Sequence, residues 1–217
     1  APAEFRLIEK DSYWAAHHAE LERPAPAVQV LNADALAFPW ESLEGPWKII
    51  SNLPYNVGSP LMWDIVSRTP DLTRAVFMVQ KEVADRMAAS PGTKNYGAYT
   101  VKLRLYAEPA GRFAVGPGNF FPPPRVESAV LRLNRRPVFD DQGVPLDADA
   151  IAAACTMAEA AFATRRKTLS NSCKTYFAGR GPQGAAVIAR LPQLFERAGI
   201  DPRLRGETLD LPEFVRL

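Results

Sequence analysis

Three short apolar segments in the first quarter of the chain are each followed by polar residues. A helix-like stretch separates the first two segments, and a loop separates the second from the third. Strands that alternate with helices and loops in this way pair as a parallel sheet in an α/β fold. The carboxyl ends of parallel strands meet at one edge, so we expect these polar residues to lie together. The strands are 5–9, 28–32 and 47–50, and the polar residues are Glu9, Asp34 and Asn52.

The third strand leads into the sequence Asn-Leu-Pro-Tyr, residues 52–55. Pro54 has a fixed φ and no amide hydrogen, so it turns the chain out of the strand ladder and makes a stiff corner. In an open α/β sheet, ligands bind at this edge. The side-chain oxygen of Asn52 and a backbone carbonyl can accept both hydrogens of a planar exocyclic amine, while the Tyr55 ring stacks on the base. The alternative is an ordinary turn, since Asn and Pro are common turn residues.

Two hydrogen-bond acceptors and a stacking ring in this arrangement have a specific chemical use. The lone pair on N6 of adenine is delocalised into the ring, so this amine is a poor nucleophile. Acceptors placed at its two hydrogens favour a pyramidal nitrogen and stabilise the positive charge that develops during attack, which is an electrostatic transition-state effect.

The two carboxylates at the same predicted edge indicate a ligand that contains a nucleoside. A carboxylate after a strand of a nucleotide-binding fold commonly holds ribose hydroxyls, and a second one can accept from an adenine amine. Taken singly, Glu9 could be a loop acid and Asp34 a helix N-cap. Three polar strand ends in register favour a nucleoside-containing cofactor.

A proline-rich segment, residues 118–126, precedes a further strand at 128–133. Three consecutive prolines have little conformational freedom to lose, so they can present Phe120 or Phe121 rigidly as a stacking platform for a flipped-out base. The alternative is a loop whose phenylalanines fill the core, and we expect one of the two rings to do so.

The last third of the chain reads as helical and basic. A linker rich in Pro, Gly and Asp spans residues 135–149, and helical sequence follows it. Residues 151–217 carry 10 Lys and Arg against 6 Asp and Glu, a net +4, whereas residues 1–50 carry 4 against 8, a net −4. The basic cluster suits contact with RNA phosphates, although solvated helix cations give the same pattern. Its residues are Arg165, Arg166, Lys167 and Lys174.

Several classes of protein do not fit the sequence. No apolar run approaches the roughly 18–20 residues that span a bilayer, and the first residues show neither a basic region nor an apolar stretch typical of a secretory signal. Cys155 and Cys173 lack metal-ligand spacing, so we expect buried free thiols in a reducing cytoplasm.

With these motifs placed, the chain resembles the ribosomal RNA adenine N6,N6-dimethyltransferases of the bacterial small-subunit (KsgA) group. The shared motifs are residues 8–11, 32–36, 52–56, 80–86, 120–130, 161–169 and 199–202. The resemblance implies an α/β fold: a class I, Rossmann-like methyltransferase domain that uses S-adenosylmethionine, over residues 1–138. It also implies a small all-helical RNA-binding domain over residues 146–217.

The resemblance implies a role for each predicted site residue. Glu9 would hold the cofactor's ribose and Asp34 its adenine, with Lys10 and Ala35 as further cofactor-binding residues. Asn52 would contact both cofactor and target. Together with the Leu53 and Pro54 backbone it would hold the target N6, while Tyr55 and Phe120 sandwich the base. Arg165, Arg166, Lys167 and Lys174 would bind RNA.

The reaction implied by the resemblance is transfer of two methyl groups to each of two adjacent adenines of small-subunit rRNA. The methyl group moves in line from sulfonium to nitrogen, with no metal and no covalent enzyme intermediate. The expected partner is a pre-ribosomal particle in the cytoplasm, met by a monomeric enzyme with no membrane contact.

The chain departs from the family pattern at its start. The family begins with a Gln-rich segment, a strand and a Gly-rich loop that wraps the methionine part of the cofactor, and nothing before Phe5 supplies these. We therefore expect Ala1 not to be the natural start, and the sheet to lack a central strand.

Three other functions remain open on the sequence. A large-subunit rRNA adenine methyltransferase of the macrolide-resistance type shares the Asn-Leu-Pro-Tyr corner but usually has Pro-Lys-Pro at 122–124. A non-catalytic rRNA-binding assembly factor would not need the Gly-rich loop. A DNA adenine methyltransferase would share the corner chemistry but does not predict the basic cluster at 165–167.

Overall fold

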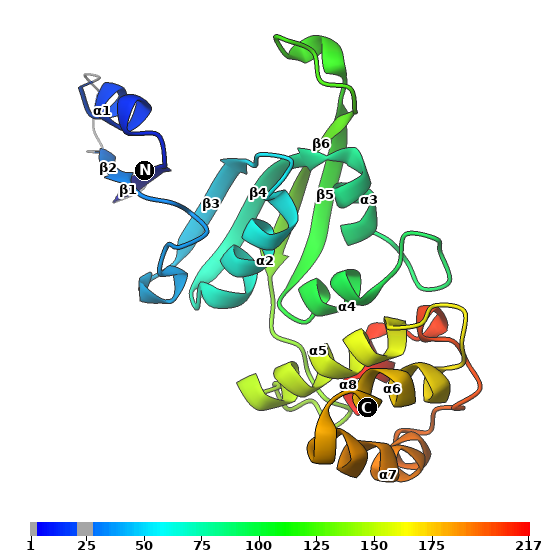
Figure 1. Ribbon diagram of the computed structural model, residues 1–217. Coiled ribbons are helices and arrows are strands. Elements are labelled where there is room, and N and C mark those ends of the chain that lie inside the picture. The colour runs from blue at the N-terminus through cyan, green and yellow to red at the C-terminus, as the bar shows by residue number, and fades with distance from the viewer. Residues whose placement is uncertain (1–3, 21–27) are drawn as a thin grey trace.

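The computed structural model describes residues 4–20 and 28–217 of the protein, so the first three residues, at the departure from the family pattern, lie outside it. The described part of the chain contains six strands and eight α-helices, and Figure 1 shows their arrangement. The strands are β1 (Phe5–Glu9), β2 (Val28–Asn32), β3 (Trp47–Asn52), β4 (Leu72–Gln80), β5 (Ala107–Val115) and β6 (Ser128–Arg135). The helices are α1 (Ser12–Glu20), α2 (Gly58–Arg68), α3 (Lys81–Met87), α4 (Ala98–Arg104), α5 (Ala148–Phe162), α6 (Leu169–Ala178), α7 (Gly181–Ala198) and α8 (Leu211–Arg216).

The strands form two sheets rather than one. β1 and β2 pair in parallel, and a second sheet has the order β3-β4-β6-β5, in which β3 and β4 are parallel and the other pairings are antiparallel. β1 and β3 meet through side chains, because the Arg6 guanidinium lies 5.0 Å from the centre of the Trp47 ring. The described residues therefore form an interrupted sheet, with no described strand between β1 and β3.

The burial pattern of each strand follows its place in the sheet. β3 is an edge strand whose residues alternate, and Ile50 is 80% exposed. β4 is an inner strand, and Ala75, Phe77 and Val79 on one of its faces are fully buried. Helix α2 covers this core with Met62 and other apolar side chains at helical spacing. The apolar alternation thus fixes which face of each strand packs inward.

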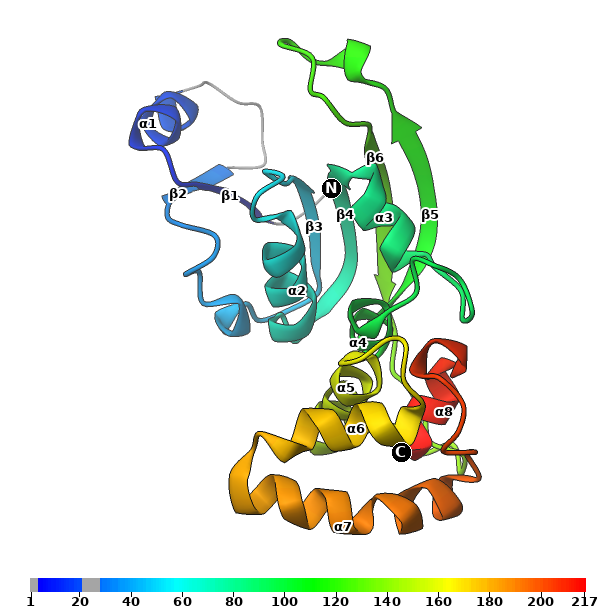
Figure 2. The same cartoon turned by 45° about the vertical axis from the view of Figure 1, so that its right-hand side comes forward.

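The C-terminal helices enclose a second hydrophobic core. Apolar residues of α5, α6, α7 and α8 fill it, and Tyr96 and Val101, from the first part of the chain, pack into the same cluster. Helix α5 begins where Asp147 caps it by accepting a hydrogen bond from the Ala150 amide at 2.8 Å. These helices lie at one end of the larger sheet (Figure 2).

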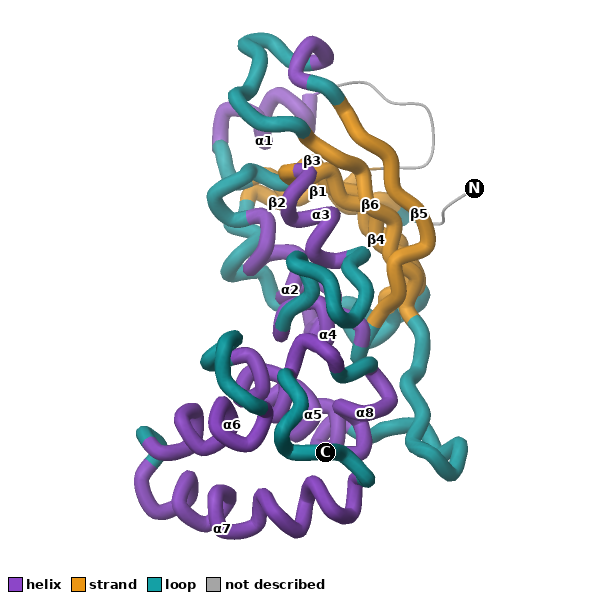
Figure 3. The backbone as a smooth tube through the Cα atoms, turned by 90° about the vertical axis from the view of Figure 1, so that its right-hand side faces the viewer, coloured by secondary structure: helices purple, strands orange, loops and turns teal. Residues whose placement is uncertain are grey.

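The opposite end of the sheet holds the carboxyl ends of β3 and β4. The segment between β5 and β6, residues 116–127, continues beyond the sheet at this end and contains the short 3-10 turn η2 (Pro117–Asn119) (Figure 3). The helical part and this segment are thus separated by the length of the sheet. Among the helices described, none combines the length and apolar character needed to cross a membrane.

Candidate active site

The corner after β3 is anchored by Leu53. Its amide donates a hydrogen bond to the Met78 carbonyl of β4 at 3.0 Å, and its side chain is buried in the core. Because neighbouring residues of an extended chain point to opposite sides, this anchor leaves Asn52 and Pro54 exposed. The Asn52 carboxamide forms no hydrogen bond with any residue in the described part of the chain, so both its polar atoms are available to a ligand.

The Pro54 carbonyl, the second predicted acceptor, has a partner already. The Val57 amide donates to it at 3.1 Å as the chain turns into α2. A carbonyl oxygen has two lone pairs, so one remains for an amine hydrogen. This turn holds the carbonyl in a fixed direction.

Tyr55 is joined to the start of β6. Its hydroxyl shares a hydrogen bond with the hydroxyl of Ser128, a fully buried residue that pairs with Gln80 of β4 and Val115 of β5. The bond fixes the half-buried Tyr55 ring beside the point where the segment 116–127 leaves the sheet. The hydrogen bond therefore joins the predicted corner to the start of β6.

The prediction that Phe120 or Phe121 fills the core is wrong. Phe120 is half-buried, Phe121 is fully exposed, and neither ring belongs to the hydrophobic core. The reason is that the segment extends past the sheet, where none of the described helices covers it (Figure 1). The Phe121–Pro122 peptide bond is cis. Phe120 thus lies on the same segment that Ser128 and Tyr55 anchor.

The carboxyl end of β1 is held by β2. The Asn32 carboxamide donates hydrogen bonds to the carbonyls of Glu9 and Lys10, each at 3.0 Å. One carboxylate oxygen of Glu9 accepts from the Asp11 amide at 2.8 Å. The other carboxylate oxygen has no partner among the described residues and can accept a ribose hydroxyl.

Asp34 is held from two sides. One carboxylate oxygen accepts the Leu36 amide at 3.0 Å, and the other lies 2.8 Å from the Lys10 ammonium. The hydrogen bond from Lys10, followed by that from the Leu36 amide, holds the pKa of Asp34 below its ordinary value. A turn rather than a helix follows Asp34, so the alternative of a helix N-cap is wrong. The next residue, Ala35, is fixed because its carbonyl accepts the Trp40 indole N–H at 3.0 Å.

The predicted site residues thus fall into two groups. Glu9, Lys10, Asp34 and Ala35 lie at the carboxyl end of the β1–β2 pair, and residues 52–55 lie at the carboxyl end of β3. The interruption between β1 and β3 separates the two groups. Within residues 4–20 and 28–217, no cluster of His, Cys, Asp and Glu suits a metal ion.

The four predicted RNA-binding residues differ from one another. The Arg165 guanidinium contacts Glu207 at 3.0 Å and donates to the carbonyls of Tyr96 at 3.0 Å and Thr93 at 3.3 Å. It therefore ties the loop before α4 to the C-terminal helices. The other three are exposed, and their side chains have no partner in the part of the chain that the structure describes: Arg166, Lys167 and Lys174.

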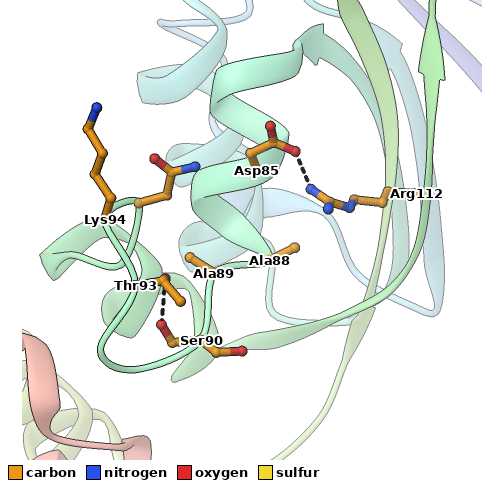
Figure 4. A pocket seen from close by; sticks show the side chains of 8 residues that line it. Asp85, Ala88, Ala89, Ser90, Thr93, Lys94 and Arg112 are labelled. Atoms are coloured by element: carbon orange, nitrogen blue, oxygen red, sulfur yellow. Dashed lines mark hydrogen bonds and ion pairs between the residues drawn. The ribbon is translucent and has the colours of Figure 1, made fainter.

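Sequence reasoning gave no role to a pocket of about 370 Å³ beside α3 (Figure 4). The ion pair between Asp85 and Arg112 forms one wall, and Ser90 and Lys94 from the loop before α4 form another. A second pocket, of about 330 Å³, shares Asp85 and reaches the segment 116–127. The motif at 80–86 supplies residues to both pockets and is the feature of the sequence that points to them.

Comparison with known proteins places these features in a family. A family model described as ribosomal RNA adenine dimethylase matches residues 4–190. The chain is 42% identical over 219 residues to the ribosomal RNA small subunit methyltransferase A of Nitratidesulfovibrio vulgaris, covering 100% of this chain and 76% of that protein. It is 37% identical over 195 residues to the protein of the same name from Corynebacterium diphtheriae, covering 89% and 62%.

Two solved structures share the fold. A dimethyladenosine transferase from Plasmodium falciparum superposes with a TM-score of 0.72 at 20% identity, over 98% of this chain and 80% of that chain. The 23S rRNA methyltransferase ErmE superposes with a TM-score of 0.65 at 22% identity, over the same shares. These likenesses confirm the predicted α/β, Rossmann-like methyltransferase fold.

Proposed function

The chain belongs to the ribosomal RNA adenine dimethylase family, and from that premise we propose that it methylates N6 of adenines in small-subunit (16S) rRNA with S-adenosylmethionine as donor. The observation that carries this proposal is the corner after β3. Leu53 anchors the corner, and the unpartnered Asn52 carboxamide is left exposed beside the held Pro54 carbonyl.

The corner acts on the target amine. The Asn52 side-chain oxygen and the Pro54 carbonyl accept the two N6 hydrogens, which localises the lone pair and stabilises the charge that develops on nitrogen. With its lone pair localised in this way, N6 would accept the methyl group from the donor's sulfonium and would release one proton to solvent. Tyr55 and Phe120 stack on the two faces of the base.

The residues at the ends of β1 and β2 suit the adenosyl part of the donor. The free carboxylate oxygen of Glu9 accepts ribose hydroxyls, and Asp34, ionised and held by Lys10, retains lone pairs for an adenine amine. Ala35 lines this site, and Asn52 contributes from β3. When bound, S-adenosylmethionine supplies the electrophilic methyl group.

The substrate we propose is a pre-ribosomal particle during ribosome assembly. One small helical domain with a few free cations, Arg166, Lys167 and Lys174, is a limited means of selecting a site on naked RNA. Each of two adjacent adenines receives two methyl groups. The enzyme works as a monomer and without a metal. Equal methylation of protein-free rRNA and of particles would remove the particle from this proposal.

The test is a calorimetric titration of S-adenosylmethionine into the protein, Asp34→Ala and Asp201→Ala. Asp201 is a matched control, because it is also a carboxylate paired with a neighbouring cation, here Arg203 at 3.0 Å. We expect Asp34→Ala alone to lose binding. Mass spectrometry of nucleosides from treated unmethylated particles should show N6,N6-dimethyladenosine in 16S rRNA.

Other outcomes would favour the alternatives. Affinity for small-subunit particles without any S-adenosylmethionine binding would support a non-catalytic rRNA-binding assembly factor. Dimethyladenosine found only in 23S rRNA would support a large-subunit enzyme. Either result would overturn the proposed function.

A further inference from the structure

The segment 116–127 carries an aromatic ring to which the proposed chemistry assigns no role. Phe121 is 101% exposed, the most exposed large apolar side chain among the residues that the structure describes. It follows Phe120 directly, and the segment that holds both extends beyond the sheet at the end where β3 and β4 finish (Figure 3). Covering a fully exposed phenylalanine with a bound partner gains hydrophobic free energy.

The segment is firmly attached beside the active-site corner. At its end, the Glu127 carbonyl accepts the Lys81 amide at 2.8 Å, and the Glu127 carboxylate lies 2.9 Å from the Lys81 ammonium. The next residue, Ser128, shares its hydrogen bond with Tyr55. Whatever covers the segment therefore lies close to the base that the corner holds.

Phe120 and Phe121 cannot both stack on the same base. The backbone at Phe120 is extended, with φ −126° and ψ 151°, and successive side chains of an extended chain point to opposite sides. The half-buried Phe120 ring turns toward the protein, where the target base is proposed to bind. The Phe121 ring turns away from it.

The charge around Phe121 favours nucleic acid. Arg125 is exposed, and its guanidinium has no partner among the described residues, whereas the carboxylate of Glu127 is neutralised by Lys81. The unpaired charge of this segment is therefore positive. An exposed ring next to a free cation is the arrangement by which proteins bind single-stranded nucleic acid, with the ring stacking on a base and the cation on the backbone.

We propose that Phe121 stacks on an unpaired RNA base next to the target adenine, and that Arg125 contacts the phosphate between them. This inference rests on the proposed function for the target. It makes Phe121 a positioning residue that orders the substrate strand without touching the reacting atoms.

The matched variants are Phe121→Ala, Phe121→Trp and Phe113→Ala. Phe113 is also an exposed phenylalanine, at 63%, but it lies within β5 rather than on the segment. With unmethylated small-subunit particles, we expect Phe121→Ala to raise KM at least tenfold and to change kcat less than twofold. Phe121→Trp and Phe113→Ala should both match the wild type.

A second measurement reads the stacking without the methyl donor. The probe is an unstructured RNA that contains one adenine, a 2-aminopurine next to it, and pyrimidines on both sides. The fluorescence of 2-aminopurine is quenched when this base stacks on the Phe121 ring. We expect quenching by the wild type and Phe121→Trp but not by Phe121→Ala. Equal quenching and equal KM for Phe121→Ala and Phe113→Ala would overturn the inference, whatever the activity. A wild-type protein that quenches the probe but transfers no methyl group would remove the proposed function and leave the stacking role supported.

Discussion

The Lys10 ammonium lies 2.8 Å from a carboxylate oxygen of Asp34, joining the loops that follow β1 and β2. These two strands pair in register up to Glu9 and Asn32, so the ion pair continues their contact past the last backbone hydrogen bonds. The proposed nucleoside site is therefore shaped before any ligand arrives.

The first prediction concerns the titration of Asp34. The Lys10 contact keeps its pKa below the ordinary 3.8, so its ionised form stabilises the fold at higher pH, and this contribution is lost as pH falls through the lowered value. We expect Lys10→Met to raise the pKa toward 3.8, measured by NMR titration of the carboxyl carbon. Lys94→Met removes an exposed lysine elsewhere and should leave the pKa of Asp34 unchanged. If the titration midpoint of Asp34 is the same in Lys10→Met as in the wild type, the contact between Lys10 and Asp34 does not lower the pKa.

The second prediction concerns the Asn52 carboxamide. Removing a single group that stabilises transition-state charge typically lowers kcat about 10²- to 10³-fold, and we expect Asn52→Ala to do so. Its affinity for S-adenosylmethionine, measured by calorimetry, should fall less than tenfold. Asn56→Ala is the matched control, because Asn56 is an exposed asparagine of the same turn. Similar kcat values for the two variants would argue against the corner as the catalytic element.

The third prediction separates Arg165 from Arg166. Arg165 holds Glu207 and two carbonyls of the loop before α4, so Arg165→Ala should lower the melting temperature as well as RNA affinity. The exposed Arg166 has no such partners, so Arg166→Ala should lower affinity for rRNA at unchanged melting temperature. It should also reduce the salt slope of binding by about 0.7–1. A large loss of stability in Arg166→Ala would reverse these roles.

The contrast between Arg165 and Arg166 shows where prediction from the sequence stops. Local patterns predicted strands, the corner at 52–55 and the basic helical tail, because periodicity and proline act over a few residues. The partners of Arg165 are more than forty residues away along the chain or on another element. No local sequence pattern therefore distinguishes Arg165, whose guanidinium binds distant residues, from its solvated neighbour Arg166.

The sheet in two parts has a similar explanation. The apolar runs of β1 and β3 predict strands but not which strands they pair with, and the described chain places no strand between them. For Phe120 and Phe121, hydrophobicity alone favoured burial, yet the segment extends past the core. Exposure there is a tertiary property, set by how far β5 and β6 continue beyond the helices.

The fourth prediction concerns the two free cysteines, of which Cys173 is buried as expected and Cys155 is half-buried. Burial raises the pKa of Cys155 to about 11 and that of Cys173 to about 12. At pH 8 both thiols are therefore almost entirely protonated, and only the thiolate reacts. We expect native protein to resist iodoacetamide at pH 8, measured by intact mass, and to take up two adducts once unfolded. Rapid modification of the native protein would contradict the burial.

The fifth prediction concerns Glu159, which joins the two parts of the chain. Its carboxylate accepts from the Lys102 ammonium of α4 at 2.5 Å and the Tyr176 hydroxyl of α6 at 2.7 Å. Lys102 also lies 4.5 Å from the centre of the Trp63 ring of α2. Losing a charged hydrogen-bond partner at this partly exposed site costs about 1–2 kcal/mol, so Glu159→Gln should lower the melting temperature by about 2–8 °C in a chain of this size.

The pH dependence of the difference in melting temperature between the wild type and Glu159→Gln tests whether the charge of Glu159 causes it. Burial raises the pKa of Glu159, but the hydrogen bonds from Lys102 and Tyr176 outweigh burial and hold it below the ordinary 4.5. The stabilisation is therefore present above pH 4.5 and is lost as pH falls through the lowered value. Melting curves of the wild type and Glu159→Gln should differ most near neutral pH and converge in acid. Glu196→Gln, at an exposed glutamate on α7 whose side chain has no partner in the described chain, should follow the wild type at every pH. A constant gap between wild type and Glu159→Gln would mean that packing rather than charge joins the two parts.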